Sequence, residues 1–65
     1  MWEICKANLG NKAVIVYSEG SETKGTTGII REANENFILV ETDCGRRIWI
    51  KPETIVKIKE AQEVR

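Results

Sequence analysis

The sequence predicts an all-β fold, namely a small, strongly bent five-stranded barrel with a short N-terminal helix. Short runs of β-branched residues recur along the 65 residues, and Gly, Pro, Asn or Asp residues bound each run. Two of these runs flank a three-residue segment that contains Gly45, which is typical of a β-hairpin. Gly28 lies inside another run and indicates a bend by which a small sheet curls. We interpret residues 1–65 as a single domain.

A short helix is predicted for residues 1–9. Trp2, Cys5 and Leu9 follow a three- and four-residue spacing, so they would share one helix face, and Gly10 would end the helix. This face either plugs one open end of the barrel or docks a partner.

The next elements are two strands joined by a polar segment. Residues 13–17 are a continuous β-branched run of strand length, which indicates a strand buried on both faces or nearly so. Residues 18–25 are polar and rich in turn residues, so we expect an exposed loop or an irregular hairpin tip. The second strand is predicted at residues 26–32, followed by a turn at residues 33–36.

The clearest element is a hairpin formed by two apolar runs on either side of Asp43-Cys44-Gly45. Gly45 stands where a type I turn followed by a bulge needs a left-handed residue, and this turn fixes the register. The residues that would share one face are Ile38, Val40, Ile48 and Ile50. The residues on the other face are Phe37, Leu39 and Trp49, beside Glu41, Arg47 and Lys51. Because both faces are partly apolar, we expect the second face to be covered as well.

The chain ends with a turn, a strand and a charged tail. Pro52 with Glu53 and Thr54 suits a single 3₁₀ turn, a fifth strand is predicted at residues 55–59, and residues 60–65 are expected to be frayed. The positions that we predict to be least exposed are Val14, Val16, Ile38, Val40, Ile48 and Ile58. Together these features are typical of an SH3-like small barrel.

Composition argues against several classes of function. Ten Lys and Arg balance ten Asp and Glu, so the chain lacks the overall positive charge of many dedicated nucleic-acid-binding proteins. The chain has no His and only two Cys, which argues against a metal site and against a Cys–His catalytic pair. Without a base that titrates near neutral pH, we expect neither enzymatic activity nor a cofactor.

Compartment and assembly follow from length and hydropathy. No apolar run is long enough for a membrane helix and no signal-peptide pattern is present, so we expect a cytoplasmic protein with no membrane partner. The chain begins at Met and reads as a complete small protein. A domain of this size buries only about 60% of the surface that its unfolded chain exposes, so we also expect a homo-oligomer.

The order of the elements resembles that of the Sm-like proteins, including the bacterial Hfq type. The similar segments are the apolar residues at 14–17, 28–30, 37–40 and 55–56. The resemblance implies an oligomeric barrel that contacts RNA from the turn after the second strand and from the segment after the fourth. Those two places hold Asn34-Glu35-Asn36 and Lys51-Pro52-Glu53 here, where the family has an acidic residue with Asn, or an aromatic, and then Arg-Gly or Tyr-Lys-His.

A second resemblance is to the SH3-like domain that ends bacterial biotin protein ligases. It rests on the segment Gly45-Arg46-Arg47-Ile48 and implies the fold alone, because the catalytic part of such a ligase is absent.

The candidate functional surface is the outer face of the hairpin. Arg47, Trp49 and Lys51 alternate along one strand, which is the arrangement of basic and aromatic side chains that holds phosphates and stacks bases. With Asn34 and Asn36 they form the predicted set for binding single-stranded RNA.

The same surface also suits contact with protein. In this second interpretation the residues Trp2, Phe37, Leu39 and Trp49 form an apolar interface with another subunit or with a different polypeptide. Zero net charge favours the protein interface, whereas the predicted topology and the basic strand favour RNA. Both interpretations stay open at this point.

Overall fold

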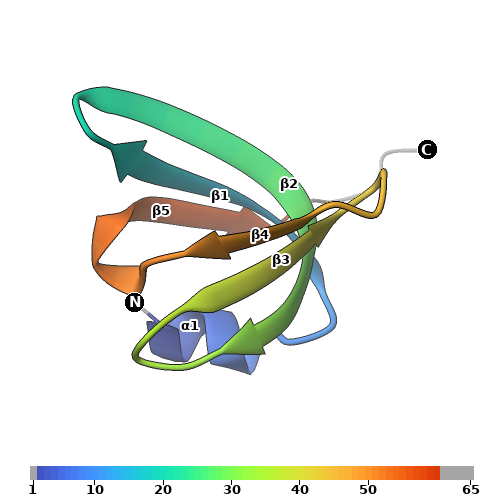
Figure 1. Ribbon diagram of the computed structural model, residues 1–65. Coiled ribbons are helices and arrows are strands. Elements are labelled where there is room, and N and C mark those ends of the chain that lie inside the picture. Colours follow the sequence, from blue (N-terminus) through green and yellow to red (C-terminus); the bar gives the residue numbers. More distant parts are fainter. Residues whose placement is uncertain (1, 61–65) are drawn as a thin grey trace.

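The computed structural model describes residues 2–60, which form a strongly bent antiparallel sheet with a short helix packed against it (Figure 1). The elements are α1 (Trp2–Ala7), β1 (Lys12–Glu19), β2 (Glu22–Ala33), β3 (Ile38–Thr42), β4 (Arg47–Ile50), the 3₁₀ helix η1 (Pro52–Thr54) and β5 (Ile55–Glu60). The strand order is β4-β3-β2-β1-β5. The predicted all-β, five-stranded small barrel with an N-terminal helix and a 3₁₀ turn before the last strand is confirmed. Residue 1, in the predicted helix, and residues 61–65, in the segment predicted to be frayed, lie outside the described residues, whereas Glu60, also predicted to be frayed, is the last residue of β5.

The β3–β4 hairpin has the register that the sequence predicts. Ile38 pairs with Ile50 and Val40 pairs with Ile48, so these four side chains share the inner face. Gly45 has a φ of 84°, and its N–H donates to the Thr42 carbonyl oxygen over 2.9 Å. The left-handed residue at the turn therefore sets which side chains face outwards, as expected.

The β1–β2 hairpin is longer and more regular than predicted. Residues 18–25 were expected to form an exposed loop or an irregular hairpin tip; they do form a hairpin tip, but β1 runs to Glu19 and β2 begins at Glu22. Gly20 has a φ of 63° and opens a two-residue turn in which Glu19 pairs with Glu22. Polar composition misled the prediction, because the two strand ends project beyond the core and can be polar on both faces (Figure 1).

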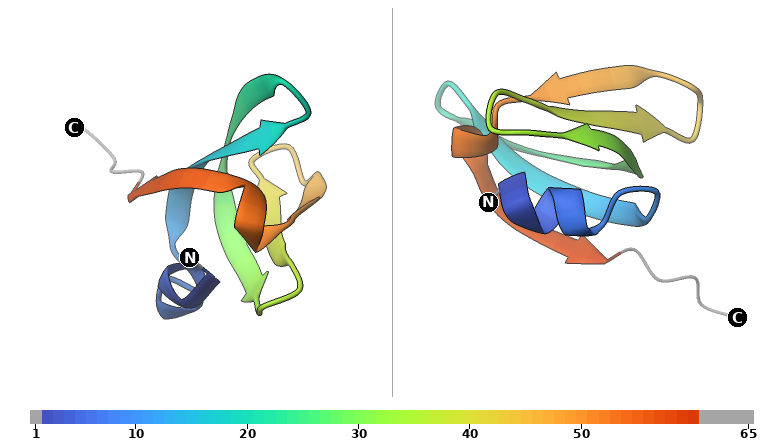
Figure 2. Two further views of the ribbon diagram at one scale, coloured as in Figure 1. Left: turned by 90° about the vertical axis from the view of Figure 1, so that its left-hand side faces the viewer. Right: turned by 90° about the horizontal axis from the view of Figure 1, so that it is seen from below.

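The bend of β2 lies where Gly28 predicts it. A Cβ atom on Gly28 would collide with the Glu41 carbonyl oxygen and would lie 2.8 Å from Cγ1 of Val40, so β2 and β3 approach too closely here for any side chain. A register shift between Ile30 and Glu32 adds an extra residue just beyond this point. Both irregularities help the sheet to curl. The two views of Figure 2 show the curled sheet.

The core lies inside the curled sheet and under α1. Its buried residues are Cys5, Ala13, Ile15, Ile30, Ile38, Val40, Ile50 and Ile55. The predicted core positions Ile38 and Val40 are confirmed, but Val14 and Val16 are only half-buried. The inner face of β1 belongs to Ala13 and Ile15, and a continuous β-branched run gave no alternation from which to choose the face.

The two remaining positions that were predicted to be least exposed, Ile48 and Ile58, lie on the edge strands. Ile48 on β4 and Ile58 on β5 are half-buried and pack against the core. In β5, a bulge at Val56 places Ile55 and Ile58 on the same inner face, because Tyr17 pairs with Ile55 and Ile15 pairs with Ile58. A strand that alternates without a bulge would have placed Ile55 and Ile58 on opposite faces.

Helix α1 packs against one end of the barrel (Figure 2). Cys5 is fully buried and Trp2 packs against the core, which agrees with the interpretation that this face covers the barrel end. Leu9 does not belong to this face: the helix ends at Ala7 and Leu9 is 45% exposed. The chain turns away because Gly10, with a φ of 84°, donates its N–H to the Ile30 carbonyl oxygen over 2.8 Å.

Candidate functional site

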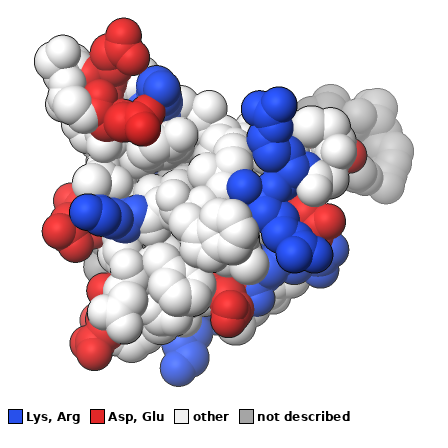
Figure 3. Space-filling model, in the orientation of Figure 1, with Lys and Arg blue, Asp and Glu red and all other residues white. Residues whose placement is uncertain are grey.

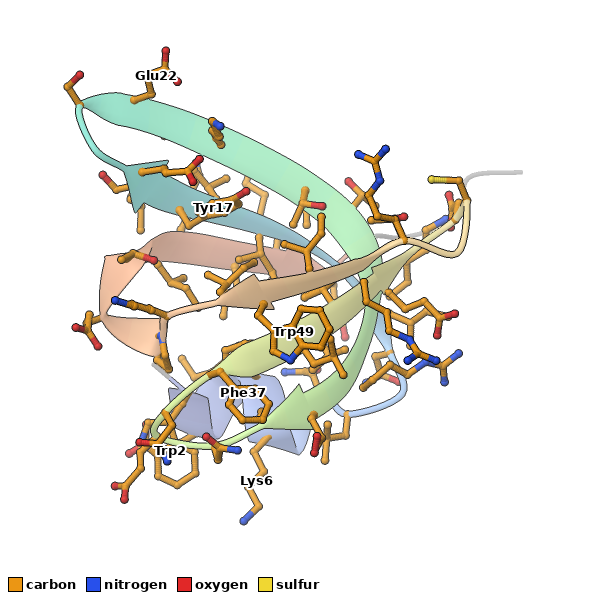
Figure 4. The ribbon with its side chains drawn as sticks, viewed as in Figure 1. Trp2, Lys6, Tyr17, Glu22, Phe37 and Trp49 are labelled. Carbon is orange, nitrogen blue, oxygen red and sulfur yellow. The ribbon has the colours of Figure 1, made fainter. Side chains whose placement is uncertain are left out.

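The outer face of the β3–β4 hairpin presents one large exposed aromatic side chain. Trp49 is 61% exposed and pairs with Leu39, which is half-buried. Figure 4 shows the rings of Phe37 and Trp49 on the same side of the hairpin. Arg47 and Lys51 flank Trp49 along the strand, and both are exposed. Pairing with Glu41 and Leu39 places Arg47 and Trp49 on one face of β4, and Lys51 follows directly after the end of this strand.

Positive charge on this face is only partly neutralised. Glu41 lies directly opposite Arg47, but its carboxylate accepts a hydrogen bond from Nε of Arg31 over 2.8 Å. Within residues 2–60, neither Arg47 nor Lys51 forms a salt bridge. Figure 3 shows Lys and Arg side chains grouped beside a broad uncharged surface. The face therefore combines exposed aromatic surface with unpaired positive charge.

The two predicted asparagines lie in the β2–β3 turn and not on β4. The side-chain Oδ1 of Asn34 accepts hydrogen bonds from the N–H groups of Asn36 and Phe37, over 2.7 and 2.9 Å. This pattern is an Asx turn, in which the side chain shapes the backbone that leads into β3. The Oδ1 atom of Asn34 is therefore engaged inside the protein, whereas Asn36 is exposed.

Trp2 belongs to a different surface from Trp49. It lines a pocket of about 390 Å³ with Glu35, Pro52, Glu53 and Ile55. Nζ of Lys6 lies 5.8 Å from the centre of the Trp2 ring. This pocket lies between the β2–β3 turn and η1, which are the two places at which the Sm-like resemblance implies RNA contacts. Each place contributes a carboxylate to the pocket, Glu35 from the turn and Glu53 from η1.

A second pocket, of about 350 Å³, lies beside β4. It is lined by Tyr17, Ser18, Glu19, Gly20, Trp49, Ile50, Lys51 and Thr54. The Lys51 carbonyl oxygen accepts hydrogen bonds from the backbone N–H and the hydroxyl of Thr54, over 3.0 and 2.7 Å, which fixes the backbone where β4 ends. Sequence analysis missed Tyr17, since only closure of the barrel brings the end of β1 beside β4.

The two cysteines differ in environment. Burial raises the pKa of the Cys5 thiol. Hydrogen bonding to the Thr42 hydroxyl and, less strongly, to the backbone of Arg46 lowers the pKa of the exposed Cys44 thiol. Among residues 2–60, no group of three or more His, Cys, Asp or Glu side chains is arranged to hold a metal ion. None of the helices in this part of the chain has the length and hydrophobicity to cross a membrane.

Comparison with known proteins gives no assignment. No protein-family model matches the chain, and a search of curated proteins finds no significant match.

Proposed function

We propose that this chain is a non-enzymatic binding module of the Sm-like type, which binds single-stranded RNA through the outer face of β4 and acts as an oligomer. The observation that supports the proposal is the exposure of Trp49 between two basic residues that form no salt bridge within residues 2–60. Stacking a base on an exposed indole contributes about 1–3 kcal/mol, and Arg47 and Lys51 would hold the neighbouring phosphates.

Assembly matters to this function because one chain offers few phosphate contacts. Zero net charge supplies no long-range attraction, so an isolated chain would bind weakly and with a shallow salt dependence. Linking several copies of the β4 face can raise the affinity by about 10² or more without any new contact.

A titration with short labelled single-stranded RNA at low salt tests the proposal. We expect the parent protein to bind and the double variant Arg47→Glu, Lys51→Glu to lose most of its binding. The control is Lys57→Glu, Lys59→Glu, which makes the same change in net charge on β5. Equal, negligible binding by the parent and the Arg47, Lys51 variant would overturn the RNA proposal.

The alternative is a protein-interaction module that has no nucleic-acid ligand. Two observations favour it: Phe37 and Leu39 extend the apolar surface beside Trp49, and Glu35 and Glu53 line the pocket near Trp2. Carboxylates there would repel a phosphate chain. This alternative gains support if RNA fails to bind while Trp49→Ala disrupts association with a protein, since aromatic interface anchors commonly cost about 2 kcal/mol or more when truncated.

A further inference from the structure

Strand β4 has a free edge with unused backbone hydrogen-bonding groups. It pairs with β3 alone among the strands of residues 2–60. The N–H of Thr42 donates to the Arg46 carbonyl oxygen over 2.8 Å, which marks this as a hydrogen-bonded pair. In an antiparallel ladder, such pairs alternate with pairs whose peptide groups point away from each other. The N–H and C=O groups of Arg47 and Trp49 therefore point towards the free edge.

Space for an added side chain exists along this edge. The pocket of about 350 Å³ is lined on one side by Trp49 and Ile50 of β4 and on the other by the end of β1, which contributes Tyr17. Tyr17 packs against the core from the inner face of the sheet. An additional strand beside β4 could thus place an inward-facing apolar side chain against Tyr17 while its backbone bonds to Arg47 and Trp49.

Charge indicates what kind of strand fits. A strand that continues the sheet would place alternate residues opposite Arg47, Trp49 and Lys51 on the outer face. Two carboxylates near β4 are already engaged: Glu41, opposite Arg47, accepts a hydrogen bond from Arg31, and Glu19, which lines the pocket, lies 2.6 Å from Nζ of Lys24. The complementary strand therefore has acidic residues opposite Arg47 and Lys51 and an apolar residue opposite the indole of Trp49.

A second copy of this chain is a poorer occupant of the edge. Two strands within residues 2–60 of a second copy have free edges: β4, which carries the same basic side chains, and β5, which carries Lys57 and Lys59 opposite Val16 and Val14 on the outer face of the sheet. Pairing β5 with β4 would bring these lysines close to Arg47 and Lys51. Like charges side by side in a sheet are destabilising, so charge favours a different, acidic strand.

We propose that the free edge of β4 binds an extended acidic peptide segment of another protein by strand addition. The segment has Asp or Glu at its first and fifth positions, an apolar or aromatic residue at the third, and apolar residues at the second and fourth. Backbone hydrogen bonds supply affinity, and the alternate side chains supply specificity. This binding does not depend on RNA, although a polyanion and the peptide would compete for Arg47 and Lys51.

The test uses the full chain and a short blocked peptide with the core Glu-Val-Tyr-Val-Glu. We expect amide NMR signals of Arg47 and Trp49 to shift and their hydrogen exchange to slow on titration. A peptide that is N-methylated on the amides facing β4 should bind about tenfold more weakly or worse, because it loses backbone donors. The variant Arg47→Glu, Lys51→Glu should prefer the matched peptide with Lys in place of both Glu residues.

Several results would overturn the proposal. Equal binding of the methylated peptide would exclude strand addition, and an unchanged preference in the charge-reversed variant would exclude the acidic pattern. Absence of peptide binding at millimolar concentration would also overturn it, even if RNA binds. Protection of the Arg47 and Trp49 amides in a self-associated form without peptide would assign the edge to a second copy instead.

Discussion

Gly28 gives the sharpest prediction at the scale of single residues. Its replacement by Ala would drive a Cβ atom into the Glu41 carbonyl oxygen, and the collision involves backbone, which cannot rotate away. We expect Gly28→Ala to lower the free energy of unfolding by about 1–3 kcal/mol, as measured by urea denaturation. Gly25→Ala is the matched control, because nothing lies within 4 Å of its added Cβ. If both variants are as stable as the parent, the close approach of β2 and β3 is wrong.

Some residue roles could be predicted from sequence and others could not. The positive φ of Gly45 and the bend at Gly28 follow from local chemistry, since only glycine suits such positions. The engagement of Asn34 in an Asx turn and the place of Tyr17 beside β4 depend on contacts that the chain makes only when folded. For the same reason, alternation along β4 predicted that Arg47 and Trp49 share a face but not which cations form no salt bridge within residues 2–60.

At the scale of elements, the inner face of strand β1 can be tested by two substitutions. Ile15 is fully buried, whereas Val16 is half-buried on the outer face. Ile15→Thr would bury a hydroxyl in an apolar core, so we expect it to cost about 2 kcal/mol or more in the free energy of unfolding. Val16→Thr keeps the same β-branched shape and should change this free energy by less than about 1 kcal/mol. A larger loss of unfolding free energy in Val16→Thr than in Ile15→Thr would mean that Val16, and not Ile15, faces the core.

Elements differ in how far their sequence determines them. The β3–β4 register was predictable because a turn glycine and alternating side chains agree on it. The inner face of β1 and the length of the β1–β2 hairpin were not, because one segment is apolar throughout and the other polar throughout. The bulge at Val56 likewise depends on pairing with β1, a partner distant in sequence.

At the scale of the whole molecule, the proposal requires self-association. Light scattering at rising protein concentration should give a mass several times the 7.4 kDa of one chain. If Trp49→Ala lowers this mass while Val56→Ala, which alters another exposed apolar residue, leaves it unchanged, the outer face is the interface between copies and not the RNA face. A mass of one chain at every concentration would remove the oligomeric part of the proposal.

The central claim is that Trp49 and its basic neighbours form the ligand-binding face, and the fluorescence of Trp49 reports on it directly. In a Trp2→Phe variant, Trp49 is the sole tryptophan. The account predicts that short single-stranded RNA at low salt changes Trp49 emission to a saturable end point. It also predicts that half-saturation moves to higher RNA concentration as salt rises. Two results would contradict the account. In the first, the RNA does not bind and Trp49 emission stays constant. In the second, the RNA binds but Trp49 emission still does not change.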